Sequence, residues 1–123
     1  MQFLSLESVQ PYISSSSLSD LIWDTVSLWN TFEKQTLGIQ LVRCVDSIPA
    51  NIAEGFGRYH KKDKQKFFYN ARGSVYEAQF WIEKAKRRSL IDEKEYTIMK
   101  KILDNLPKEI NWLIKVTEDK LTI

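Results

Sequence analysis

The sequence predicts an all-α protein, an antiparallel up-and-down four-helix bundle formed by a single domain over residues 1–123. Four stretches of the chain repeat apolar residues at steps of three and four, which is the spacing of one face of an α-helix. Only 4 glycines and 3 prolines occur in the 123 residues, so helix-breaking positions are scarce. A chain of this length buries about two-thirds of its unfolded surface in one core.

The sequence leaves two readings for the start of the first helix. Ser14 to Ser17 favour caps and turns over helix interiors, and Pro11 suits only a first helical turn. Residues 1–17 are therefore either irregular or an extension of the first helix, which begins between about residue 10 and residue 18. An apolar row then follows at helical spacing: Leu18, Ile22, Val26 and Trp29. This row predicts a buried helix that ends near Thr31.

The second helix is expected from about residue 34 to residue 54. Its apolar row is Leu37, Leu41, Val45, Ile48 and Ile52. Because this row passes through Pro49 without losing phase, we expect a kinked but continuous helix, with Ser47 or a water bonded to the carbonyl of Val45 that the proline leaves free. A break with Ser47 as a new N-cap is the alternative. Gly55 and Gly57 should end the helix in a left-handed cap.

The third helix, from about residue 62 to residue 88, is apolar on two opposed faces. Its core row is Phe67/Phe68, Ala71, Val75, Ala78, Ile82 and Ala85, and its second row is Tyr69, Gly73, Tyr76 and Phe80. A helix of this kind must be covered on both sides. The N-terminal segment, the first helix and another subunit are the three candidate covers, and we predict that the second row is an oligomer interface.

The fourth helix is expected to begin at Asp92. Glu95 follows three residues later, which completes the pattern of a capping box. The apolar row is single-sided: Tyr96, Met99, Leu103, Leu106, Ile110, Leu113 and Thr117. Pro107 should kink this helix in the middle.

A polar row runs beside the core of the second helix and predicts a structural seam against the third. Its expected members are Ser47, Asn51 and Glu54 on one helix and Ser74 and Glu77 on the other. Arginines nearby would neutralise the carboxylates, and a satisfied seam would set the helix register. We favour this interpretation over an acid–base pair, because no nucleophile, metal-ligand set or phosphate-cradling loop accompanies these residues. Cys44 is expected to be a small buried thiol.

The charge is unevenly distributed. The net charge is +2, but residues 1–33 hold four acids and no Lys or Arg, so the remainder carries 18 − 12 = +6. Lysines crowd the start of the third helix, where the helix dipole disfavours cations, so an external phosphate would explain them. The predicted nucleic-acid contacts are Arg58, Lys61, Lys62, Lys64 and Lys66, with Arg43 and Arg72 as secondary candidates. A lysine-rich solubilising loop is the alternative.

Several spaced sequence words resemble one bacterial protein family. They are Ser47-Ile48-Pro49-Ala50-Asn51-Ile52-Ala53-Glu54-Gly55 with Gly57-Arg58, Leu37 to Arg43 before it, and Ala71-Arg72-Gly73-Ser74 with Glu77 after it. This pattern resembles the 23S rRNA-intervening-sequence proteins, to which the accessory variability determinants of diversity-generating retroelements look related. The resemblance covers roughly residues 18–121. It implies a four-helix bundle, a homopentameric assembly and structured RNA as a partner.

Together these observations predict a non-enzymatic, oligomeric scaffold that binds nucleic acid, with structured RNA as the expected ligand. A protein–protein adaptor without a nucleic-acid ligand is the alternative, and an enzyme ranks below both because no catalytic constellation is recognisable. No cofactor or metal is expected, since the chain has one histidine and one cysteine. No apolar run approaches the roughly 20 residues that span a bilayer, so we expect a cytoplasmic protein.

Overall fold

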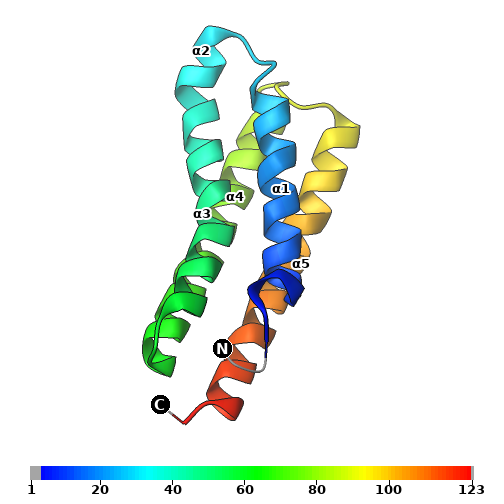
Figure 1. Ribbon diagram of the computed structural model, residues 1–123. Coiled ribbons are helices and arrows are strands. Elements are labelled where there is room, and N and C mark those ends of the chain that lie inside the picture. The colour runs from blue at the N-terminus through cyan, green and yellow to red at the C-terminus, as the bar shows by residue number, and fades with distance from the viewer. Residues whose placement is uncertain (1–3, 123) are drawn as a thin grey trace.

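The predicted four-helix bundle is confirmed by the computed structural model, which describes residues 4–122 (Figure 1). The four long helices are α1 (Gln10–Val26), α3 (Ile39–Gly57), α4 (Lys61–Arg87) and α5 (Glu93–Lys120). Three short elements accompany them: a 3-10 turn η1 (Leu6–Ser8), one turn of helix α2 (Thr31–Glu33) and a π-helical turn η2 (Lys34–Gly38). The described residues contain no strand, and none of their helices is long and apolar enough to cross a membrane.

The helices run alternately up and down, and each packs against two neighbours. Both α3 and α5 contact α1 on one side and α4 on the other, so α1 and α4 lie diagonally across the bundle (Figure 1). The predicted apolar rows meet along its axis. The largest fully buried side chains are Phe68, Leu18, Ile22, Leu41, Ile48, Ile52, Ile82, Met99, Leu103, Leu106, Ile110 and Leu113. One continuous core therefore stabilises the whole bundle.

Helix α1 includes the serine run and begins at residue 10, the early limit of the predicted range. Pro11 lies in the first turn, where a missing backbone N–H costs no helical hydrogen bond. Buried Ser15 is satisfied because its hydroxyl donates to the Tyr12 carbonyl at 3.4 Å. The predicted end near Thr31 is wrong: α1 ends at Val26, and the chain turns over residues 27–29. Asn30 then caps α2, its side chain accepting from the Glu33 N–H at 3.2 Å.

Pro49 lies inside α3 without breaking it, so the predicted continuous helix is confirmed and the alternative break is wrong. The hydrogen bond that Ser47 forms differs from the predicted bond to the carbonyl of Val45. The Ser47 hydroxyl lies 2.7 Å from the carbonyl oxygen of Cys44, not beside that of Val45. This is the bond from a serine hydroxyl to the carbonyl three residues earlier, which the helix itself brings within reach. The kink at Pro49 stays a prediction.

The end of α3 differs from the glycine cap expected from the sequence. Among residues 4–122 only Ser89 has a positive φ, 61°, and no glycine does. Gly55 is buried within the helix instead, and a Cβ there would lie 2.5 Å from Cε1 of Phe68 and 3.0 Å from the Lys64 carbonyl oxygen. The glycine is needed because α3 and α4 approach closely at this level, not because the chain needs a left-handed residue.

The fourth predicted helix corresponds to α5. Asp92 accepts from the Glu95 N–H at 2.7 Å, and the Glu95 carboxylate accepts from the Asp92 N–H at 2.9 Å, so the predicted capping box is confirmed. The helix passes through Pro107 and continues to Lys120. Its predicted row is buried from Met99 to Thr117, while the phenol of half-buried Tyr96 donates to Glu83. This hydrogen bond raises the pKa of Tyr96 to about 12.

Glu109 on α5 is a carboxylate that the fold partly desolvates. One of its oxygens, Oε1, is buried with no hydrogen-bond partner among the described residues, and burial raises the pKa of this side chain despite an opposing hydrogen bond with Ser14. A raised pKa means that ionisation of Glu109 costs stability above the folded-state pKa. That cost disappears as the pH falls and the carboxyl is protonated.

Glu109→Gln should therefore raise the free energy of unfolding at pH 7, by no more than about 1 kcal/mol because the side chain is partly exposed. Thermal unfolding at pH 7 and near pH 4, where wild-type Glu109 is largely protonated, tests this, because the gain should vanish at about pH 4. The control is Glu7→Gln, the same change at an exposed carboxylate. A gain that is equal at both pH values would contradict the assignment.

Candidate nucleic-acid interface

The predicted nucleic-acid contacts centre on the junction between α3 and α4. Helix α3 ends at Gly57, residues 58–60 turn the chain, and α4 begins at Lys61. In an antiparallel bundle the N-terminal end of α4 lies beside the C-terminal ends of both its neighbours, α3 and α5 (Figure 1). Cations at this end of α4 consequently lie close to the unpaired carbonyls of two other helices.

Lys64 caps the end of α3 and is not a free cation. Its side chain is only 5% exposed, and its ammonium group donates to the carbonyls of Phe56 at 3.0 Å and Gly55 at 3.5 Å. Burial lowers the pKa of Lys64. The prediction that Lys64 contacts a nucleic acid is wrong, because a phosphate cannot reach an ammonium that is buried against backbone carbonyls.

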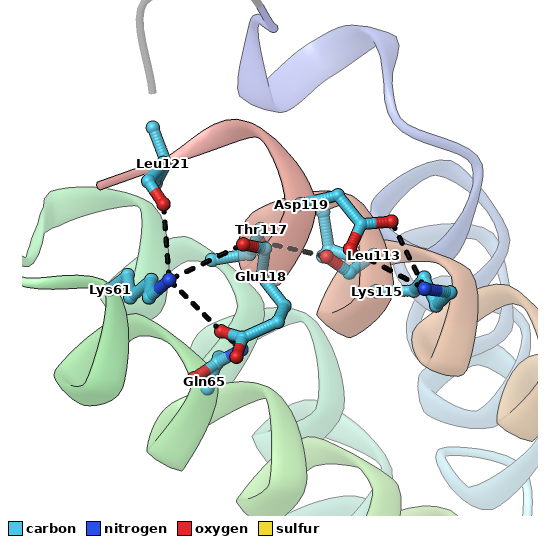
Figure 2. A network of polar contacts seen from close by, with 8 residues as sticks. All are labelled: Lys61, Gln65, Leu113, Lys115, Thr117, Glu118, Asp119 and Leu121. Atoms are coloured by element: carbon cyan, nitrogen blue, oxygen red, sulfur yellow. Dashed lines mark hydrogen bonds and ion pairs between the residues drawn. The ribbon is translucent and has the colours of Figure 1, made fainter. Parts of the chain in front are cut away.

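Lys61 caps the C-terminal end of α5 in the same way (Figure 2). Its ammonium group lies 3.2 Å from Oε2 of Glu118 and donates to the carbonyls of Glu118 at 3.3 Å and Leu121 at 3.1 Å. Gln65 also donates to the Glu118 carboxylate, at 3.2 Å. The hydrogen bond from Lys61, with that from Gln65, lowers the pKa of Glu118. The ammonium group of Lys61 thus already has partners within the fold, although a larger fraction of the Lys61 side chain is exposed than of Lys64.

These contacts supply an internal reason for two of the four lysines in the first turns of α4. Sequence reasoning treated them as unfavourable at a helix start and therefore inferred an external anion. The structure shows that Lys61 and Lys64 stabilise the C-terminal ends of neighbouring helices, where the same dipole rule favours cations. The sequence carried no signal for this, because the partner of Lys61 is 57 residues away.

The other cations at the junction remain accessible. Arg58 is exposed, although it forms an ion pair with Glu54 at 2.8 Å and its guanidinium lies 4.7 Å from the centre of the Phe67 ring. Lys62 and Lys66 are exposed one turn apart on the outside of α4, and within residues 4–122 neither forms an ion pair. Such side chains can contact a phosphate without breaking any contact of the fold.

The two aromatic residues of the junction, Phe56 and Tyr59, also differ in how far they are exposed. Tyr59 is 72% exposed. Among the described residues its ring contacts one other ring, that of His60, in an edge-type arrangement with the centroids 5.0 Å apart. Phe56 is half-buried and packs edge-on against Phe68, with the ring centroids 6.0 Å apart. Of these two aromatic residues, only Tyr59 therefore presents its ring to solvent, where a base could stack on it.

The two secondary arginines lie away from the junction and from each other. Arg72, in the middle of α4, donates to Oδ1 of Asn111 at 2.8 Å and lies 4.8 Å from the centre of the Tyr69 ring. Arg43 lies in the first half of α3, towards the opposite end of the bundle. The structure does not bring Arg43 and Arg72 together with the junction cations into one patch.

The predicted polar seam between α3 and α4 forms only in part. The hydroxyls of Ser47 and Ser74 lie 2.6 Å apart, and the Cys44 thiol donates to the Ser74 carbonyl at 3.1 Å. Asn51 stays on its own helix, donating to the Ser47 carbonyl at 2.7 Å. The seam is therefore a serine–serine contact with Cys44 beside it. That it sets the register of the two helices stays a prediction.

The carboxylates of the predicted seam turn outward instead of facing each other. Glu54 pairs with Arg58, and Glu77 accepts from the indole N–H of Trp81 at 3.0 Å. Cys44 is the small buried thiol that the sequence predicted. Burial, with a contribution from Glu77, raises the pKa of Cys44 to about 12, so the thiolate is scarce at neutral pH.

The second apolar face of α4 is open to solvent along the described chain. Tyr69 is 48%, Tyr76 57% and Phe80 51% exposed, and no atom lies within 4 Å of the position of a Cβ on Gly73. We call these four residues the α4 ridge. Helix α1 lies diagonally across the bundle from α4, and η1 packs beside α1. Among residues 4–122, neither the N-terminal segment nor α1 therefore covers this face.

The described residues contain no group of three or more His, Cys, Asp or Glu side chains that could hold a metal ion. The described surface instead carries exposed cationic side chains and exposed aromatic rings. Such a combination suits binding to an anionic polymer or to another protein.

Comparison with known proteins agrees with the fold. A solved structure described as a protein of unknown function from the S23 ribosomal protein family of Bacteroides thetaiotaomicron superimposes with a TM-score of 0.79. The two chains are 21% identical, and the match covers 86% of this chain and 99% of the other. No curated protein matches the sequence. The model of the 23S rRNA-intervening sequence protein family matches residues 7–112. With this match spanning nearly the whole bundle, the chain belongs to the family of 23S rRNA-intervening sequence proteins.

Proposed function

We propose that this protein is a non-enzymatic, self-associating scaffold that binds structured RNA through cations at the α3–α4 junction. The observation that carries the proposal is the pair Lys62 and Lys66, exposed on one face of α4 and without an acidic partner in the described part of the chain. Arg58 and Tyr59 add a cation and an exposed ring beside them. The family name, which refers to a sequence inserted in 23S rRNA, supports RNA as the ligand class.

Self-association is the second part of the proposal. The α4 ridge presents three half-exposed aromatic rings on one helix face, and such patches mark interaction sites more often than free surface. Lys62 and Lys66 continue the same helical row towards the start of α4. An oligomer formed through the ridge, for which we favour a homopentamer, repeats these lysines on one rigid body. Several weak phosphate contacts then add up to useful affinity.

Charge reversal of Lys62 and Lys66 tests the RNA contact. Lys62→Glu/Lys66→Glu should weaken binding of a structured RNA roughly tenfold or more and flatten the dependence of log K on log salt, since each lost phosphate contact removes about 0.7–0.9 from the slope. Filter binding over a salt series measures both quantities. The matched control is Lys101→Glu/Lys108→Glu on α5, which changes the net charge equally at exposed lysines without an ion pair among the described residues.

Two results would count against this function. An unchanged salt slope in the Lys62→Glu/Lys66→Glu variant would remove the junction from the binding site. An oligomer whose mass in light scattering does not change on adding RNA would favour the protein adaptor instead. The exposed Trp23, Leu28 and Phe32 would then be the surface to examine, as they are 63%, 86% and 73% exposed.

A further inference from the structure

A second apolar surface lies on a different side of the bundle from the α4 ridge, where α1 ends and α3 begins. It is a pocket of about 380 Å³ with an almost wholly apolar lining, floored by Val26 and Val42 and bordered by Trp23 and Ile39. Trp23 is 63% and Ile39 43% exposed. We call it the α1–α3 pocket. Its volume is within the range of about 300–1,000 Å³ typical of ligand pockets and is large enough for an aromatic side chain.

The rims of the two surfaces carry opposite charges. Lys34 and Arg43 border the α1–α3 pocket, and within residues 4–122 neither forms an ion pair. On α4, Glu77 and Glu83 lie three residues on either side of Phe80. Each accepts a hydrogen bond from an aromatic side chain, Trp81 and Tyr96 respectively, and in the described chain neither has a cationic partner. Lys84 also lies beside Phe80, with its ammonium nitrogen 5.5 Å from the ring centre, so two carboxylates and one cation surround the ring. Their net negative charge matches the two cations that border the apolar pocket.

The two surfaces also lie at the same level of the bundle. Ser74 on α4 contacts both Cys44 and Ser47 on α3. Phe80 is six residues further along α4, and because the helices are antiparallel, its level on α3 is about six residues before Cys44 and Ser47. Ile39 occupies that level. Figure 1 agrees, since the beginning of α3 and the end of α4 lie at the same end of the molecule.

This placement determines the kind of assembly that the surfaces can form. Because α1 and α4 are diagonal neighbours, the pocket and the ridge face different sides of one chain. Contact between them joins two different patches, so it is a heterologous contact, which generates a ring when the rotation closes. Equal levels along the bundle axis require little translation from one copy to the next, which favours a closed ring over a filament.

We propose that the α1–α3 pocket receives the Phe80 side chain of a second copy of this chain, with Lys34 and Arg43 of one copy facing Glu77 and Glu83 of the other. The proposal rests on the self-association proposed above and names the surface that the α4 ridge contacts. It also gives Arg43 a role at the subunit contact in place of the nucleic-acid contact predicted from the sequence.

A charge exchange tests this contact in the full-length chain by light scattering at fixed protein concentration. Lys34→Glu/Arg43→Glu and Glu77→Lys/Glu83→Lys should each convert the oligomer to a monomer, and the variant that combines all four changes should recover the oligomer. All four residues are exposed, so their substitution should not change the circular dichroism of the bundle. An oligomer insensitive to Lys34→Glu/Arg43→Glu, or a combined variant that stays monomeric, would overturn the proposal.

Cysteine cross-linking gives an independent readout that does not depend on charge. Ile39→Cys and Phe80→Cys, each in a Cys44→Ala background, should form a disulfide-linked dimer when co-expressed and oxidised, and neither should when oxidised alone. A dimer formed by Phe80→Cys alone would show that α4 pairs with α4 and would overturn the pocket contact.

The same measurements separate this proposal from the proposed function. A wild-type protein that is monomeric at high micromolar concentration contradicts self-association and the pocket contact together. An oligomer that binds RNA with the expected salt dependence, yet is unaffected by reversal at Lys34 and Arg43, contradicts the pocket contact alone.

Discussion

Phe68→Ala should lower the free energy of unfolding by about 3–5 kcal/mol, the largest loss that we expect from a single substitution. Phe68 on α4 is fully buried and packs edge-on against Phe56 and directly against Gly55 on α3. Removing the ring loses its transfer free energy and leaves a cavity at the point of closest approach of the two helices. Domains of this size are stable by roughly 5–15 kcal/mol, so the variant should lie close to the unfolding threshold.

Urea unfolding followed by circular dichroism measures this loss. The matched control is Phe32→Ala, which removes the same ring from a position that is 73% exposed and should change stability by no more than about 0.5 kcal/mol. A loss below about 1 kcal/mol for Phe68→Ala would mean that α3 and α4 are not tightly packed at this level.

Gly55→Ala should destabilise the bundle by roughly 1–3 kcal/mol, even though alanine is the better helix former by about 1 kcal/mol. The new methyl group would lie 2.5 Å from Cε1 and 2.9 Å from Cδ1 of Phe68. A backbone oxygen, that of Lys64, is 3.0 Å away, so side-chain rotation alone does not relieve the overlap. The two helices must separate, and the Lys64 cap on the end of α3 would be disturbed with them.

The control for this prediction is Gly73→Ala, the same change in the middle of α4. Among the described residues, no atom of the same chain lies within 4 Å of its Cβ position. At protein concentrations where the α4 ridge contacts no second copy, helix propensity therefore acts alone, and the variant should be more stable by about 0.5–1 kcal/mol. Opposite signs for one chemical change would show that Gly55 is required by packing. Gly55→Ala combined with Phe68→Leu should lose less than the sum of the two single losses, because the smaller side chain makes room; strict additivity would contradict the overlap.

Much of the fold was predictable from local periodicity. The rows through Leu41 and Ile52 and through Val75 and Ile82 are buried as the helical spacing indicated, because side chains three and four residues apart share a helix face whatever the partner. The capping box at Asp92 was predictable for the same reason, since both of its hydrogen bonds join residues three apart. The end of α1 was not predictable in this way, because the apolar spacing continues to Trp29 while the turn into α2 begins at Ser27.

The tertiary structure decided the roles of the residues at the α3–α4 junction. The sequence by itself determined that lysines crowd the start of α4 and that two glycines lie in the last turn of the helix before it. Only the antiparallel packing showed that Lys64 and Lys61 cap α3 and α5, and that Gly55 admits the Phe68 ring. The physical reason is that periodicity and capping act between neighbours in sequence. Contacts between helix ends depend on which helices lie side by side, and this is set by the packing of the whole core.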